Sequence, residues 1–315
     1  MGAEFDRMID QAYRGRTAEE LCDAPIHALH GVSPGDADSL AATFGIETIA
    51  DLADREPFRA ARAIRDAAKS PGFDPGPPPG WREVFAATPL DVYQGRPDLF
   101  RLDFGPVFYR GRLDGTARLL VVGQDPSVNE ILAGRVFVGR SGQRLQGFLA
   151  KLGVARSYLM LNTFMFSIFG QFGGDNQAMS HEDPILGHRN SLFDMAGEAN
   201  PLQAVLTVGS AAREAVDHWP GVGALSRTHI LHPSFPDVAA LLDNWNQALD
   251  TLRDHVDPDD GLSVGSPYGS QFTREEVVAI PRRDLPFGLP DWHGVGDHAR
   301  RVGDTVIEWR RHPIM

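Results

Sequence analysis

An alternation of short apolar segments and helical segments between about residues 100 and 250 constrains the fold more than any other feature. Segments typical of buried strands cover residues 119–123, 158–162, 205–209 and 228–231. Helical patterns cover residues 141–152, 187–199, 210–219 and 237–254. Strands that alternate with helices predict a parallel sheet with helices on both faces. We therefore expect an α/β fold, a three-layer αβα sandwich around a four-stranded parallel sheet.

The segments on either side of this core have a different composition. Residues 1–80 predict a helical module followed by a linker, because residues 71–80 hold a density of proline that excludes regular structure. The core domain then covers residues 81–257. Residues 258–315 are rich in Pro, Gly and Asp and predict an irregular C-terminal extension with short strands, packed on the core.

The N-terminal module resembles a helix-hairpin-helix unit. Two short helices are expected around Gly31-Val32-Ser33, and a third follows Gly45-Ile46. Such hairpins grip DNA phosphates through backbone N–H groups at a helix start. The alternative is a helical packing or protein-interaction module, through which a protein partner would bind. The acidic residues of this segment favour the alternative.

Composition excludes several classes of protein. The chain has 315 residues and a net charge of −12, which argues against wholesale coating of nucleic acid. Its single cysteine, Cys22, excludes a disulfide framework and a four-cysteine iron–sulfur cluster, and it fits a reducing cytosol. No apolar run is long enough for a transmembrane helix, and the polar N-terminus does not resemble a secretory signal. We expect a cytoplasmic monomer with no membrane association.

Residues 105–170 are locally basic. They hold eight basic residues against three acidic ones, so an anion-binding face is expected there, with a solvated arginine-rich surface as the alternative. The basic residues are Arg110, Arg112, Arg118, Arg135, Arg140, Arg144, Lys151 and Arg156.

Polar residues follow three of the four predicted strands. Asp125 follows the first strand, Asn162 ends the second, and His232 follows the fourth. Ligands bind at the carboxyl ends of strands in open α/β sheets, so these side chains should converge on one crevice. A carboxylate can position water, an amide can read a planar donor–acceptor edge, and an imidazole can stabilise a leaving anion.

The residues around this trio resemble the uracil-DNA glycosylase superfamily. Gly123-Gln124-Asp125-Pro126 resembles motif A of the prototypical class, and His232-Pro233-Ser234 resembles its motif B. The run from Gly134 to Gln143 instead resembles the continuation found in the iron–sulfur class. The resemblance covers about residues 100–250 and implies that 81–257 is a catalytic domain.

This resemblance implies roles for individual residues. Asp125 would orient the attacking water, and Phe137 would stack on the flipped base. Asn162 would bond uracil N3–H and O4, and His232 would bond uracil O2 with help from the Gln124 backbone N–H. The resemblance also implies a group of DNA-contacting residues, namely Arg140, Ser141, Ser234 and Phe235.

Three departures from the superfamily pattern stand out. The cluster cysteines are missing, so no cofactor and no metal is expected, and the N-terminal module or the C-terminal extension should supply the lost bracing. Ser127 stands where the prototypical class has Tyr to block the thymine methyl, so thymine exclusion would fall to Phe164 or Met165, or be weaker. Phe235 and Pro236 change the motif B wedge, and either could fill the gap left by the base.

The resulting hypothesis is a monofunctional uracil-DNA glycosylase that leaves an abasic site. Two alternatives remain open. One is a uracil-DNA binding protein with slow turnover, although residues 127–137 lack the His of a covalently binding branch. The other is a broader glycosylase of deaminated bases, which the small Ser127 motivates. A nucleotide binder or α/β hydrolase is disfavoured because its signature loops are missing.

Overall fold

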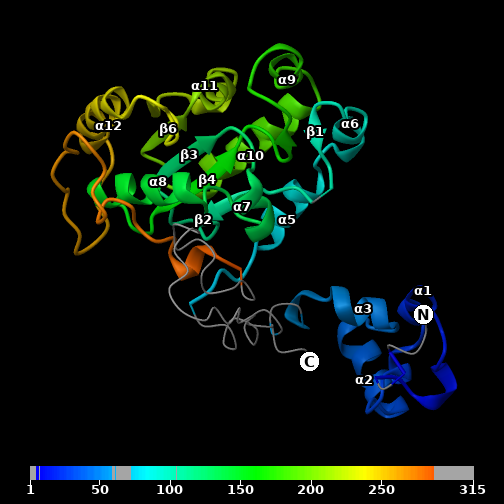
Figure 1. Cartoon of the computed structure of the whole chain (residues 1–315). Coiled ribbons are helices and arrows are strands. Elements are labelled where there is room, and N and C mark those ends of the chain that lie inside the picture. The colour runs from blue at the N-terminus through cyan, green and yellow to red at the C-terminus, as the bar shows by residue number, and fades with distance from the viewer. Residues whose placement is uncertain (1–4, 7, 59–60, 62–71, 104, 287–315) are drawn as a thin grey trace, which may run out of the picture. The chain divides into compact units, whose positions relative to one another are not determined.

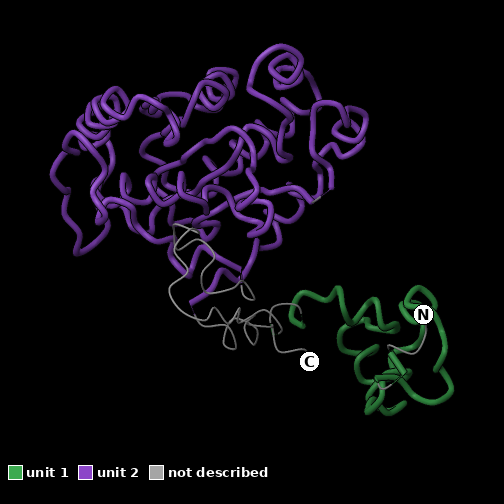
Figure 2. The backbone as a smooth tube through the Cα atoms, in the orientation of Figure 1, with its two compact units in different colours: residues 1–71 green, residues 72–315 purple. Residues whose placement is uncertain are grey.

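The computed structural model describes residues 5–6, 8–58, 61, 72–103 and 105–286. The chain divides into two compact units, residues 1–71 and residues 72–315 (Figure 2). The proline-rich stretch 71–80 falls on this boundary, and its last residues already begin helix α5 (Pro79–Ala86) of the second unit.

The described part of the first unit is helical. Its elements are η1 (Gln11–Tyr13), α1 (Ala18–Cys22), η2 (Ile26–Ala28), α2 (Pro34–Phe44) and α3 (Ile49–Asp54). A Ser or Thr precedes each of α1, α2 and α3 and pairs with an acid three residues later, which satisfies N–H groups at the helix start. At α2, the Asp36 carboxylate accepts from the backbone N–H and the hydroxyl of Ser33. An acid therefore occupies the helix start where a hairpin of this type would bind phosphate.

The second unit is built on a five-stranded sheet (Figure 1). The strands are β2 (Tyr109–Gly111), β3 (Leu119–Gly123), β4 (Tyr158–Asn162), β6 (Ala204–Val208) and β7 (Ser226–Ile230). They lie in the order β2-β4-β3-β6-β7, and the last four are mutually parallel. The predicted α/β class with its four parallel strands is confirmed. The antiparallel edge strand β2 was not predicted, and its three residues are too few to give a periodic signal.

Apolar side chains on both faces hold the sheet between helices. Along β3, Leu120 and Val122 belong to one core cluster, and Leu119 and Val121 belong to another. Strand side chains alternate between faces, so the two clusters lie on opposite sides of the sheet. The first includes residues of α5, α6 (Leu90–Gln94), α10 (Ile185–Ala199) and α11 (Ser210–Asp217). The second includes residues of α8 (Arg140–Lys151) and α12 (Val238–Arg253). None of the helices among the described residues is both long and apolar enough to cross a membrane.

Four smaller helical elements also lie among the described residues of the second unit. Helix α7 (Val128–Ala133) follows β3, and α9 (Gly174–Met179) precedes α10; η3 (Pro220–Val222) precedes β7, and η4 (Arg282–Asp284) lies in the C-terminal extension. A separate two-stranded ribbon pairs β1 (Phe100–Arg101) with β5 (Ser167–Ile168) in antiparallel fashion.

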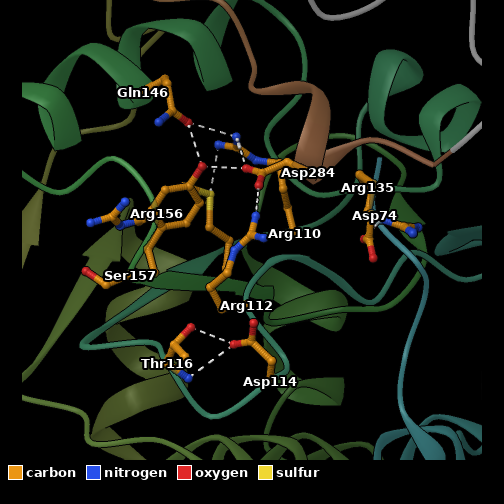
Figure 3. A network of polar contacts seen from close by, with 12 residues as sticks. Asp74, Arg110, Arg112, Asp114, Thr116, Arg135, Gln146, Arg156, Ser157 and Asp284 are labelled. Carbon is orange, nitrogen blue, oxygen red and sulfur yellow. Dashed lines mark hydrogen bonds and ion pairs between the residues drawn. The ribbon is translucent and has the colours of Figure 1, made fainter. Parts of the chain in front are cut away.

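A buried polar network joins the C-terminal extension to the sheet (Figure 3). Asp284 is 0% exposed and accepts hydrogen bonds from Arg110, Arg112 and the Tyr158 hydroxyl. Gln146 of α8 accepts a further bond from Arg110 at 2.9 Å. The described part of the extension, to residue 286, contains no strand, so the predicted short strands are wrong there. Residues 287–315 lie outside the described residues.

Candidate active site

The Gly-Gln-Asp-Pro turn lies at the carboxyl end of β3, next to the end of β4. Gly123 is in register with Asn162 across the two parallel strands. The Gly123 carbonyl accepts from the N–H and hydroxyl of Thr163, and the Gln124 carbonyl accepts from Phe164 N–H at 2.9 Å. The loops after the two strands are therefore bonded to each other, which fixes Asp125 beside Asn162.

Asp125 is partly buried and accepts hydrogen bonds at both carboxylate oxygens. Its Oδ2 accepts from the Ile168 backbone N–H of β5 at 2.9 Å, and its Oδ1 accepts from Gln124 Nε2 at 2.9 Å. Burial raises the pKa of the Asp125 carboxyl, while the Ile168 and Gln124 hydrogen bonds and the nearby charge of Arg101 oppose that shift. These donors favour the ionised carboxylate, the form that can orient a water molecule.

Two predicted site residues, Phe137 and Asn162, both lie close to Gly123. A β-carbon at this position would lie 2.5 Å from Asn162 Oδ1 and 2.6 Å from Cζ of Phe137. Real β-carbons do not come that close to other atoms, so only glycine fits here. The structure thus brings the Asn162 amide and the Phe137 ring together, as expected for a base-binding pair.

Asn162 carries the clearest sign of a ligand site. Its side chain is 1% exposed, and its Nδ2 has no hydrogen-bond partner among the described residues. An unpaired buried donor costs about 1–3 kcal/mol, which a bound ligand with an acceptor at this point would recover.

Glu130 positions Phe137, a role that the sequence prediction missed. One oxygen of the buried Glu130 carboxylate accepts from Ser127 N–H at 2.6 Å, and the other accepts from Phe137 N–H. Phe137 has a φ of 54°, in the left-handed region that non-glycine residues rarely adopt. Burial raises the pKa of Glu130, and the hydrogen bonds from Ser127 and Phe137 oppose that shift. The spacing of Ser127 and Glu130 is that of a capping box, so the sequence held this signal.

His232 lies in the loop after β7 in a defined tautomer. Its Nδ1 accepts from the Ser234 backbone N–H at 3.2 Å and lies 2.7 Å from Ser234 Oγ. An amide N–H can only donate, so the neutral ring must carry its proton on Nε2. Burial lowers the pKa of His232, which favours the neutral ring. His232 is thus a neutral donor through Nε2.

Arg144 of α8 supports the same loop. Its Nη1 donates to the Pro233 carbonyl, and its guanidinium lies over the Phe272 ring at 4.5 Å from the centroid. Burial lowers the pKa of Arg144, and the nearby charge of Arg140 adds to this shift. No sequence pattern marked this contact, because it joins segments 89 residues apart.

The predicted DNA-contacting residues lie near this loop and at the start of α8. Arg140 is exposed and Ser141 partly buried, and both belong to the first turn of α8. Ser234 is exposed, and Phe235 is 38% exposed. By contrast, Phe164 and Met165 are at most 1% exposed and belong to the hydrophobic core, so the structure gives them a packing role.

The prediction of an anion-binding face is wrong for most of the eight basic residues within 105–170. Five of the eight basic side chains pair with acids from outside residues 105–170, and so hold the fold together. The pairs are Arg110 and Arg112 with Asp284, Arg118 with Asp259, Arg135 with Asp74, and Lys151 with Glu276. The sequence average could not show this, because the acids lie far away along the chain.

The residues present do not fit an iron–sulfur cluster, since one cysteine cannot supply four thiolates. Within the described ranges, no three His, Cys, Asp or Glu side chains form a group that could hold a metal ion. A surface pocket lined by Asp194, Asn200 and Trp219 lies near the amino ends of β6 and β7, at the opposite edge of the sheet from Asp125.

The fold and the site together define an α/β domain with a carboxylate, an amide and a neutral imidazole at the carboxyl edge of a parallel sheet. Residues 110–252 match the family model described as the uracil DNA glycosylase superfamily. The chain therefore contains a domain of this superfamily, and the predicted resemblance is confirmed. Membership supports a glycosylase-type, hydrolytic function in DNA repair with DNA as the substrate. No curated protein matches the chain.

Proposed function

We propose that this protein is a monofunctional uracil-DNA glycosylase, which hydrolyses the N-glycosidic bond of deoxyuridine and leaves an abasic site. The observation that carries the proposal is the unpaired, buried Asn162 amide beside the Phe137 ring over Gly123. A planar base stacked on Phe137 would offer its polar edge to that amide. Uracil presents an acceptor at O4 and a donor at N3, whereas cytosine reverses both, so one fixed amide orientation distinguishes them.

The charges of the site suit this reaction. The target base first leaves the DNA stack. Asp125 orients a water molecule and stabilises the positive charge that develops on the sugar. Uracil departs as an anion, and the Nε2–H of neutral His232 donates to O2 where negative charge develops. The Gln124 backbone N–H adds a second donor.

The chemistry of the site favours hydrolysis by water over an amine mechanism. Lys151, at the last turn of α8, pairs with Glu276 and donates to the Ser266 carbonyl. No lysine is bonded to Asp125, Asn162 or His232 within the described residues. We further propose that the protein acts as a cytoplasmic monomer without a cofactor, in keeping with its single cysteine.

Asp125→Asn tests this proposal. The substitution keeps the size of the side chain and removes its charge, so excision from a uracil oligonucleotide should fall at least 100-fold while binding is retained. Strand cleavage after alkali measures the abasic product, and a gel shift measures binding. An unchanged excision rate would overturn the proposed role of Asp125. A shifted band that survives denaturation would instead favour a binding protein that captures DNA covalently.

A broader glycosylase is the second candidate, and one observation favours it. Ser127 is the exposed N-cap of α7, so a small side chain follows motif A. Space near C5 of the base would admit 5-substituted uracils. A panel of single-lesion oligonucleotides decides between the two, since comparable rates on uracil and on thymine mismatches would favour the broader enzyme.

A further inference from the structure

The ribbon formed by β1 and β5 lies directly against the candidate site. Its Ile168 N–H donates to Asp125 Oδ2 at 2.9 Å, and the charge of Arg101 acts on the same carboxyl. Phe100 pairs with Ile168, and Arg101 pairs with Ser167. This pairing places Arg101 next to the strand whose Ile168 binds Asp125.

Phe169, the next residue after Ile168, points out of the protein. Ser167 and Ile168 are buried, whereas Phe169 is 41% exposed. Its backbone N–H donates to the Leu99 carbonyl at 2.8 Å, so the residue is anchored even though its side chain is exposed. An anchored, exposed aromatic ring beside a candidate catalytic carboxylate is placed to stack on a base of a nucleic acid held at that carboxylate.

Arg101 covers one face of that ring. Its guanidinium carbon lies 4.4 Å from the ring centroid of Phe169, within the range of a cation–π contact. Arg101 is exposed, and no ion pair involves it among the described residues. The pair therefore presents a positive charge and a flat apolar face together, which suits a partner with phosphates and stacked bases.

The surroundings of Phe169 leave room for such a partner. The following loop contains Gly170, Gly173 and Gly174, and a β-carbon at any of them would meet no atom within 4 Å. Phe169 follows Ile168 directly, so its backbone lies one residue, a Cα spacing of about 3.8 Å, from the residue that binds Asp125.

On the basis of the proposed function, we propose that Phe169 is a further DNA-contacting residue that stacks on a base of the duplex beside the extruded nucleotide. Arg101 holds the opposite face of the ring and attracts the neighbouring phosphate. Phe169 acts beside Asp125, whereas Phe235 lies beyond His232, so the two aromatic side chains contact the DNA from separate loops.

The test compares duplex and single-stranded DNA, using the full chain and the Phe169→Ala, Phe169→Trp and Arg101→Ala variants. A single strand has no paired stack to disrupt, so the contact is needed only in the duplex. Phe169→Ala should lower the single-turnover excision rate from a U:G duplex at least 10-fold and change the single-strand rate less than 2-fold. Phe169→Trp should retain most of the duplex rate. Arg101→Ala should weaken duplex binding and reduce its dependence on salt by about one charge.

Leu262→Ala is the matched control, because Leu262 is a similarly exposed apolar residue of the C-terminal extension. It should leave both rates unchanged. Equal loss on both substrates in Phe169→Ala, or no loss on either, would overturn the inference. Binding to a duplex with a stable abasic-site analogue provides a second readout that does not need turnover. If the wild type excises no uracil, the proposed function fails, and weaker binding of Phe169→Ala to this duplex still supports the contact.

Discussion

Arg144, on helix α8, donates a hydrogen bond to the backbone carbonyl of Pro233, the residue that follows His232. Helix α8 begins three residues after Phe137. The same helix therefore connects the residue proposed to stack on the base with the residue proposed to stabilise it as an anion. The geometry of the two depends on one rigid element.

Replacing Arg144 tests this connection. Arg144→Met keeps an unbranched apolar stem but removes the donor to Pro233, so the His232 loop should shift. We expect kcat/KM for uracil excision to fall about 10-fold, which corresponds to about 1.4 kcal/mol. Arg253→Met is a matched control, because Arg253 also donates to a backbone carbonyl, that of Gly265. A similar loss of activity in both variants would contradict a specific role for Arg144.

Glu130→Gln should slow the reaction through its effect on Ser127 and Phe137, without a contact between Glu130 and the substrate. Glutamine has one accepting oxygen, so either Ser127 N–H or Phe137 N–H loses its partner. We expect the single-turnover rate to fall about 10-fold or more, since a lost hydrogen bond to a buried charged group costs about 1.5–3 kcal/mol. Glu276→Gln, which disrupts the pair with Lys151 far from the site, should leave the rate unchanged. Retention of the full rate by Glu130→Gln would exclude a positioning role.

The pH profile of excision should have an acid limb and a neutral plateau. The mechanism needs ionised Asp125 and neutral His232. Burial raises the pKa of Asp125 above its ordinary value and lowers the pKa of His232 below its ordinary value. Protonation of either group removes the active form, so activity is lost as the pH falls through the two pKa values. His232→Gln keeps a donor but cannot titrate. This variant should react more slowly, and the acid limb of its pH profile should depend on one protonation only. A wild-type rate that rises as the pH falls below neutral would contradict the assignment.

Removing Asp284 should destabilise the second unit. Asp284→Ala leaves Arg110 and Arg112 without their buried counter-charge, which costs about 3–5 kcal/mol. Urea denaturation of the full chain measures the free energy of unfolding. The control is Asp217→Ala, which breaks an exposed pair with Arg227 and should cost less than about 1 kcal/mol. Equal effects of the two substitutions would show that the network adds no more than a surface pair.

The sequence predicts the parallel strands well because their signal is local. The segments 119–123 and 158–162 match the observed strands, since each is an unbroken apolar run ended by a polar residue. Site residues at strand ends follow from the same pattern. Two positioning contacts, those of Ile168 with Asp125 and of Arg144 with Pro233, were missed because they join distant segments. The Glu130 contacts are local and were missed although the spacing of Ser127 and Glu130 is that of a capping box. Ile168 binds Asp125 from 43 residues away, and neither of the two-residue strands β1 and β5 has a periodic signal.

The position of Asp284 sets the shortest fragment of the chain that keeps the buried polar network intact. The family-matched segment ends at residue 252, yet Arg110 within it is fully buried against Asp284. A fragment of residues 110–252 would keep Arg110, Arg112 and Tyr158 but would lack the Asp284 carboxylate that they bind. A fragment for domain swaps or fusion enzymes should therefore include at least residues 72–286, from the start of the second unit past Asp284.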